Sequence, residues 1–213
     1  LSLIPKKVLV PDFAPPHTIS GYNFRIAEKE KDRYIFIGPI LDPSIHDFAP
    51  SEEIVFASFG GEPFKMPLYA MLKEISEQDT ALDVHVFATS PGLPEEGKNF
   101  KIAGYVESIF PYMASAKTAI IHGGLTSLHE ALYFGKPVLL IIDPYHPEQG
   151  NNGRMVEELG CGMMIRGDSV TAESLHTAIL SCMQMKPADL RGLYAENNGA
   201  ENFCRILDEI RKE

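Results

Sequence analysis

Short apolar runs alternate with longer amphipathic stretches along the chain from Ile54 onward. The runs have the composition of buried strands and the stretches have helical spacing, which is typical of βαβ units around a mostly parallel sheet. The predicted strands are Ile54–Phe59, Asp83–Ala88, Phe100–Ala103, Thr118–His122, Pro137–Ile141 and Gly162–Ile165. The predicted helices are Pro67–Glu77, Ile109–Ser115, Ser127–Phe134, Gln149–Leu159, Ala172–Met185 and Ala200–Lys212. We expect an α/β fold with a doubly wound, mostly parallel sheet and helices on both faces.

Residues 1–50 follow a different pattern. They hold seven of the 16 prolines and two short strand-like runs, at residues 7–10 and 34–37. Proline removes a ladder donor and fixes φ, so this stretch cannot form a continuous sheet. We expect residues 1–50 to be the tail of a preceding domain plus a linker, and residues 51–213 to be one Rossmann-like domain. The chain also opens with Leu1 rather than Met, which favours a longer protein with sequence upstream.

The loops at one edge of the predicted sheet are the candidates for a site. The carboxyl ends of parallel strands meet at a single edge, and doubly wound folds bind their ligands there. The loops that leave the strands at this edge are residues 59–64, 104–109, 122–127 and 143–152.

The loop 122–127 reads His-Gly-Gly-Leu-Thr-Ser and leads from a buried strand into a predicted helix opened by Thr126 or Ser127. Its two glycines, Gly123 and Gly124, let the backbone approach an anion. A helix start offers unpaired N–H groups and a partial positive charge of about half a unit. The side chains of His122, Thr126 and Ser127 add donors, so the loop predicts a phosphate site. One alternative stays open, in which the glycines form a tight turn and Ser127-x-x-Glu130 is only a capping box.

Two further loops carry candidate residues at the same edge. Asp143, Glu148 and Gln149 follow a buried strand, and their side chains suit the hydroxyl groups of a sugar. In the alternative interpretation, Glu148 and Gln149 only open a solvated helix. Gly60 and Gly61 follow the first predicted strand and would bring backbone amides to a second side of the phosphate, or else form a plain turn.

Composition narrows the range of partners. The chain has 19 Lys and Arg against 29 Asp and Glu, a formal charge of −10, so nucleic acid is not an expected partner. Its cysteines, Cys161, Cys182 and Cys204, are an odd number without C-x-x-C spacing, which favours a reducing, cytoplasmic compartment. No apolar run approaches the roughly 20 residues that a membrane helix needs.

Histidines and acids also raise a metal hypothesis, with His122, His129, His146 and Glu148 as candidate ligands. Their spacing matches no H-E-x-x-H, facial-triad or Cys/His pattern, so we expect neither a metal nor a cofactor. The chain also lacks a G-x-S-x-G elbow, a P-loop and a strong G-x-G-x-x-G after a strand. These absences disfavour a hydrolase, a P-loop NTPase and a dinucleotide oxidoreductase.

Three segments, taken in order, resemble the donor-binding signature of GT-B-fold glycosyltransferases: Gly104-Tyr105-Val106, the string from His122 to Glu130, and residues 143–152. The resemblance is to UDP-glucuronosyltransferases, plant secondary-product glycosyltransferases and the bacterial peptidoglycan N-acetylglucosaminyltransferase, and it covers residues 51–165 well. It implies that residues 51–213 are the C-terminal half of a GT-B fold and bind a nucleotide sugar, usually a UDP-sugar. The chain has no Trp to stack on the base, and residues 145–147 match no assigned part of the signature.

The resemblance also implies roles for matching residues. His122 would contact the diphosphate, Glu130 the ribose hydroxyls, and the Glu148–Gln149 pair the sugar. Tyr105 and Val106 would pack against the base. Amide or hydroxyl donors to the diphosphate would come from Gly124, Leu125, Thr126 and Ser127.

In the families that this chain resembles, the acceptor site and the catalytic base lie in a separate N-terminal domain, so no catalytic residue is assigned here. The segment Ile37-Gly38-Pro39 resembles the Gly-Pro that precedes the donor domain. We expect metal-independent transfer of a sugar to an acceptor hydroxyl, with the N-terminal domain or a partner subunit required. Any membrane association would be peripheral and through that missing half. The alternatives are a UDP-sugar 2-epimerase, expected to show Ser-Gly-Gly followed by paired glutamates, and a nucleotide-sugar-binding subunit that acts only with a partner.

Overall fold

The computed structural model describes residues 7–24, 28–60 and 65–212. Its strands are β1 Val8–Val10, β2 Tyr34–Phe36, β3 Ile54–Ser58, β4 Val84–Val86, β5 Phe100–Ile102, β6 Ala116–Ile121, β7 Val138–Ile142 and β8 Gly162–Arg166. Its α-helices are α1 Met66–Gln78, α2 Phe110–Ser115, α3 Leu125–Tyr133, α4 Pro147–Glu158, α5 Ala172–Met183, α6 Arg191–Glu196 and α7 Gly199–Ile210. Short 3₁₀ helices lie among the first fifty residues: η1 Gly21–Asn23, η2 Glu28–Arg33 and η3 Pro43–Asp47.

The larger sheet has the strand order β5-β4-β3-β6-β7-β8, and every pair of neighbours is parallel. Most strand residues are apolar and buried, as in β7, where all five residues are buried, because helices cover both faces. The chain enters the sheet at β3, moves outward to β5, and returns to β6 beside β3. The connections after β3 and β6 therefore run to opposite faces, which opens a crevice at the carboxyl ends of these two strands.

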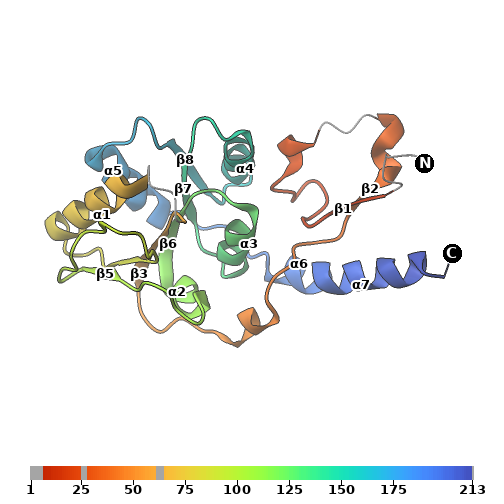
Figure 1. Cartoon of the computed structure of the whole chain (residues 1–213), viewed down its shortest axis with the longest axis horizontal. Coiled ribbons are helices and arrows are strands. Elements are labelled where there is room, and N and C mark those ends of the chain that lie inside the picture. Colours follow the sequence, from red (N-terminus) through yellow and green to blue (C-terminus); the bar gives the residue numbers. More distant parts are fainter. Residues whose placement is uncertain (1–6, 25–27, 61–64, 213) are drawn as a thin grey trace.

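Two cores lie on opposite faces of this sheet (Figure 1). On one face, α1 and α5 pack against the strands, and Leu72 of α1 is fully buried. On the other face lie α2, α3 and α4, and Leu128 of α3 is fully buried. Neighbouring residues of β3 divide between the faces, with Val55 in the first core and Phe56 in the second. The predicted fold class, a doubly wound parallel sheet with helices on both faces, is confirmed.

The elements predicted for residues 51–213 are all present, with small shifts of their ends. One shift matters for the site: α3 begins at Leu125 with Gly124 as its N-cap, so the prediction that Thr126 or Ser127 opens the helix is wrong. Helix α6 was not predicted, because its six residues bury only Tyr194 and are too short to show a periodic pattern. Within the described residues, no helix combines the length and apolar character of a membrane span.

The first fifty residues form a small sheet and a segment that packs on the larger unit. β1 and β2 pair in parallel, with Leu9 opposite Ile35. Between these strands, residues 12–23 reach α3 and α4, and Phe13 and Ile19 are buried in the core that these helices share. This packing places part of the N-terminal stretch directly beside the helices that follow β6 and β7.

Helix α7 begins where the chain crosses from the small sheet to β3. The N–H of Gly199 donates to the carbonyl of Pro39 at 3.0 Å, and the Asn202 side chain donates to the carbonyl of Ile37 at 2.8 Å. From there α7 extends away from the larger sheet, on the same side of the molecule as β1 and β2 (Figure 1). Its apolar side chains Phe203, Leu207 and Ile210 are 38%, 37% and 52% exposed, so much of this face has no covering partner within the described residues.

Candidate functional site

The loop after β6 stands at the crevice between β3 and β6. His122 follows the strand, Gly123 has φ +84°, and Gly124 returns to an extended conformation as the N-cap of α3. A Cβ atom on Gly124 would lie 2.9 Å from the Nε2 atom of His122. The imidazole therefore lies directly against the start of the helix, and only glycine at position 124 leaves room for it there.

The start of α3 presents unpaired backbone donors. The first hydrogen bond within the helix runs from the N–H of Leu128 to the carbonyl of Gly124, so the N–H groups of Leu125, Thr126 and Ser127 have no intrahelical acceptor. Gly124 has no side chain to cap them. The capping-box alternative is therefore wrong, because Ser127 lies inside the first turn. Bare amides at the positive end of a helix, with an imidazole beside them, suit an anion such as a phosphate.

Gln149 connects this loop to the one that follows β7. Its side chain is 5% exposed, and its oxygen accepts the N–H of Asp143 at 2.8 Å, which fixes the orientation of the amide group. Atoms of Gln149 lie 3.6 Å from the Cβ position of Gly123, so the two loops are in contact. Glu148 is exposed at the start of α4. The structure therefore brings Gln149, but not Glu148, against the glycine loop.

Glu130 lies on α3 beyond the glycine loop. It is partly buried, and this burial, followed by the charge of Asp42, raises its pKa to about 7. Asp42 itself is the N-cap of η3, where its carboxylate accepts the N–H of Ser44 at 2.8 Å. A carboxyl group whose ionisation falls near neutral pH is available to exchange a proton or to accept hydroxyl groups there.

The remaining predicted residues lie farther from one another. Tyr105 is 91% exposed in the loop after β5. Its ring is therefore accessible to a ligand, but few protein atoms fix its position. Val106 is partly buried and lines a separate groove with Phe48 and Tyr112. Gly60 follows β3 with φ +67° and open space around it. Gly61 lies outside the described residues.

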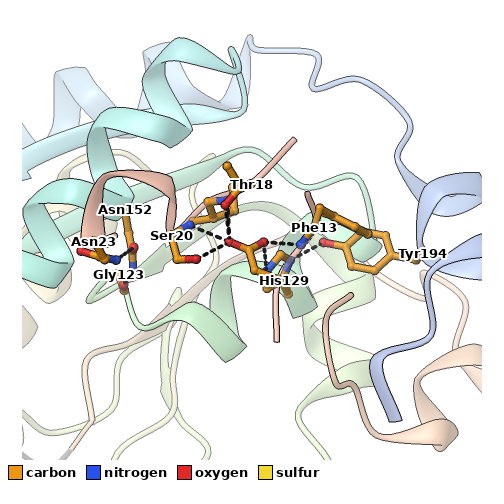
Figure 2. Close-up of polar contacts among 10 residues, drawn as sticks. Phe13, Thr18, Ser20, Asn23, Gly123, His129, Asn152 and Tyr194 are labelled. Carbon is orange, nitrogen blue, oxygen red and sulfur yellow. Dashed lines mark hydrogen bonds and ion pairs between the residues drawn. The ribbon is translucent and has the colours of Figure 1, made fainter. Parts of the chain in front are cut away.

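Sequence reasoning missed a buried polar network beside the glycine loop, drawn in Figure 2. Asn152 of α4 is fully buried, and its Nδ2 donates to the carbonyl of Gly123 at 2.9 Å. It lies three residues after Gln149 on one helix, so helical spacing alone predicts that both face the same loop. That signal was available, because Asn152 ends a segment already identified as a candidate.

Asp12 organises the other part of the network. It is fully buried, and its carboxylate accepts backbone N–H groups from Phe13, Ile19 and Ser20 and hydroxyl groups from Thr18 and Ser20. The Nε2 atom of His129, on α3, lies 3.1 Å from the carboxylate, which is within ion-pair distance. The two groups are not aligned well enough to form a hydrogen bond. The Nδ1 of His129 lies 3.0 Å from the Tyr194 hydroxyl of α6 (Figure 2). No sequence pattern indicates this pairing.

The residues weighed as metal ligands do not form one group within the described residues. His129 is engaged by Asp12 and Tyr194, and His146 is the N-cap of α4. Within the described residues, one other group of suitable atoms gathers, from Glu52, Asp83 and His85. It sits at the amino-terminal edge of the sheet, away from the crevice, and the Lys101 ammonium already lies 3.3 Å from the Asp83 carboxylate.

Fold and site together define the class, a Rossmann-like unit with an uncapped helix start after the central strand β6 of its sheet. Residues 79–209 match the glycosyltransferase family 28 C-terminal domain, and the chain belongs to this family. This family assignment does not favour the 2-epimerase alternative.

Curated relatives agree with the family assignment, and a solved structure agrees with the fold. An uncharacterized glycosyltransferase of Methanosarcina acetivorans is 29% identical over 97% of this chain and 58% of its own length. A UDP-N-acetylglucosamine–N-acetylmuramyl-(pentapeptide) pyrophosphoryl-undecaprenol N-acetylglucosamine transferase of Thermosipho africanus is 26% identical over 63% of this chain and 40% of its own. The glycosyltransferase of kitacinnamycin has a TM-score of 0.75 at 19% identity, over 96% of this chain and 55% of its own. The chain thus spans about half the length of such relatives.

Proposed function

We propose that this chain is the donor-binding part of a glycosyltransferase that transfers a sugar from a nucleoside diphosphate, in the first instance UDP, to an acceptor hydroxyl. The observation that carries the proposal is the uncapped start of α3, with His122 packed against it, at the crevice between β3 and β6. A leaving diphosphate gains negative charge as the glycosidic bond breaks. Preoriented amides and an imidazole stabilise that charge without reorganising.

In the proposed arrangement, His122 and the amides of Leu125, Thr126 and Ser127 bind the diphosphate. Glu130 accepts the ribose hydroxyls, and Gln149 contacts the sugar beside a cavity of about 300 Å³ that Asp143 and Arg166 help to line. Glu148 would reach the sugar from its exposed position, and Tyr105 and Val106 would contact the base. The positive helix end supplies the charge compensation, so the proposed mechanism needs no metal.

The base is the least constrained part of the donor. The Thermosipho relative is named for a UDP-sugar donor, whereas the solved structure of the glycosyltransferase VinC, with a TM-score of 0.50, is a complex with dTDP. Tyr105 is too exposed to select one nucleotide base over another. UDP and dTDP are therefore the two probes to compare.

The acceptor-binding half is proposed to lie in the part of the relatives that this chain does not span, joined upstream or supplied by a partner subunit. We also propose that a domain boundary lies near residue 50, between the end of the preceding domain with its linker and the donor-binding domain. The partly exposed apolar face of α7, on the same side as the small sheet, supports a packing surface for that half.

The test is calorimetric titration of the 213-residue chain with UDP and with dTDP, each with and without EDTA. We expect binding that survives the chelator and that His122→Ala weakens. His176→Ala is the matched control, because His176 pairs with Asp79 on the opposite side of the sheet. Loss of binding in EDTA contradicts the metal-free mechanism, and equal affinity of wild type and His122→Ala contradicts the phosphate site.

A further inference from the structure

We infer that Asn152 and Asn23 are positioning residues that set the direction of the glycine-loop amides toward the donor phosphates. The inference deepens the proposed function and rests on it. Neither residue needs to touch the donor, because both act on the peptide group between Gly123 and Gly124. Asn23 belongs to η1, within the stretch expected to form the tail of another domain.

The hydrogen bond from Asn152 fixes a peptide plane. A trans peptide is planar, and its carbonyl and N–H point in opposite directions. The carbonyl of Gly123 is held toward α4 by the Asn152 side chain at 2.9 Å. The N–H of Gly124 in the same plane therefore points away from α4. With φ +84°, Gly123 has wide conformational freedom, so an external bond is what selects one orientation.

Asn23 in turn fixes the Asn152 side chain. Its Nδ2 donates to the Oδ1 of Asn152 at 2.9 Å, and its own Oδ1 accepts from Asn151 at 2.9 Å. A rotated Asn152 amide would turn its oxygen toward the carbonyl of Gly123 and leave both acceptors without a donor. Burying two unsatisfied acceptors is costly, so the donor from Asn23 selects the productive rotamer.

The segment that carries Asn23 is itself rigidly held. Asp12 accepts five hydrogen bonds from residues 13–20 and pairs with His129 on α3. The same segment thus contacts α3 through His129 and reaches the glycine loop through Asn23 and Asn152 (Figure 2). Because the segment is attached both to α3 and to the loop that precedes α3, it holds this loop in place.

Asn151 provides a matched control. It is the same residue type on the same helix, and it also contacts η1, through Asn23 and the carbonyl of Tyr22. None of its described bonds reaches Gly123. A variant at position 151 therefore loses contact between α4 and η1 while leaving the peptide-plane bond in place.

The experiment compares Asn152→Ala, Asn23→Ala, Asn151→Ala and the Asn23→Ala/Asn152→Ala double variant in the 213-residue chain. Affinity for UDP and dTDP is measured by calorimetry well below each melting temperature. In parallel, NMR of the ligand-free chain records the amide shifts and hydrogen exchange of Gly124 and Leu125. We expect Asn152→Ala to weaken nucleotide binding about tenfold and to shift the Gly124 amide, with Asn151→Ala close to wild type. Asn23→Ala should have a smaller effect that disappears in the Asn152→Ala background, because it acts through Asn152.

Three results overturn the inference: an unchanged Gly124 amide in Asn152→Ala, equal losses of affinity in Asn151→Ala and Asn152→Ala, or fully additive effects of the two substitutions at 23 and 152. If the wild-type chain binds neither nucleotide, the proposed function fails instead. The amide measurements on the ligand-free chain then decide the positioning role by themselves.

Discussion

We expect the free energy of unfolding to depend on pH through the side chain of Glu130. Burial, and then the charge of Asp42, raises its pKa to about 7. In the unfolded chain a glutamate ionises at about 4.3. The folded state therefore holds a proton that the unfolded state has lost, so the stabilisation from Glu130 is complete below about pH 4.3 and declines as the pH rises toward neutrality.

We expect Glu130→Gln to remove that decline. Unfolding free energies from urea titrations at pH 5 and pH 8 should converge in the variant, whereas wild type should lose on the order of 2 kcal/mol between the two. The exposed Glu209 on α7 gives the control variant Glu209→Gln, which should keep the wild-type slope. Equal slopes for wild type and Glu130→Gln would show that the carboxyl titrates normally.

The contact between Gly124 and His122 gives the second prediction at this scale. Gly124 has φ −67° and ψ 138°, values that any residue adopts, so Gly124→Ala introduces no backbone strain. Its Cβ would instead lie 2.9 Å from the imidazole and displace it from the helix start. We expect nucleotide affinity to fall while the melting temperature changes little. Gly192→Ala in α6, where nothing lies within 4 Å, is the control. Unchanged affinity would separate His122 from the anion site.

At the scale of the elements, the sequence predicted the strands because they contain short apolar runs, as in Val138–Ile142. The glycine pair and helix that follow β6 were predicted from local rules of the same kind. The start of α3 was misplaced because Thr126 and Ser127 are good capping residues, while the real N-cap, Gly124, has no polar side chain to indicate it. The packing of residues 12–23 was not predictable, since Asp12, His129 and Tyr194 meet only through tertiary contacts.

The Asp12 network predicts how the N-terminal segment is attached. Burial acts to raise the pKa of Asp12, but the close approach of His129 and the hydrogen bonds from Ser20 outweigh it and hold the pKa below its ordinary value. Asp12→Ala would leave several donors and His129 without their acceptor. We expect a loss of about 3 kcal/mol in the free energy of unfolding and faster proteolysis within residues 12–24. Asp189→Ala, which removes an exposed pair with Arg191, is the control and should change little. Protease resistance equal to wild type would show that packing alone holds the segment.

At the scale of the whole molecule, the candidate site lies on one unit, but its supports come from both parts of the chain. The donor-side residues follow β6 and β7, while Asp42, Asp12 and Asn23 reach them from the first fifty residues. The first fifty residues therefore take part in the proposed donor site. A structural change at the junction with an acceptor-binding half would alter the pKa of Glu130 through the charge of Asp42. It would also alter the orientation of the glycine loop through Asn23.

The completeness of the active site gives the last prediction. Transfer to a hydroxyl requires a general base that reaches the acceptor, and the candidate bases here are either buried or proposed to face the donor, as Glu130 faces the ribose. His122 lies against the helix start, where a diphosphate would favour its protonated, donating form. His129 is buried in the pair with Asp12. We therefore expect the 213-residue chain to bind donor but to transfer no sugar.

Activity should appear when the acceptor-binding half of a relative is fused or added, and His122→Ala should abolish this activity. Donor hydrolysis is measured separately as the control. Steady donor-dependent transfer by the chain alone would place the acceptor site within these residues, and the partly exposed face of α7 would then need a different explanation.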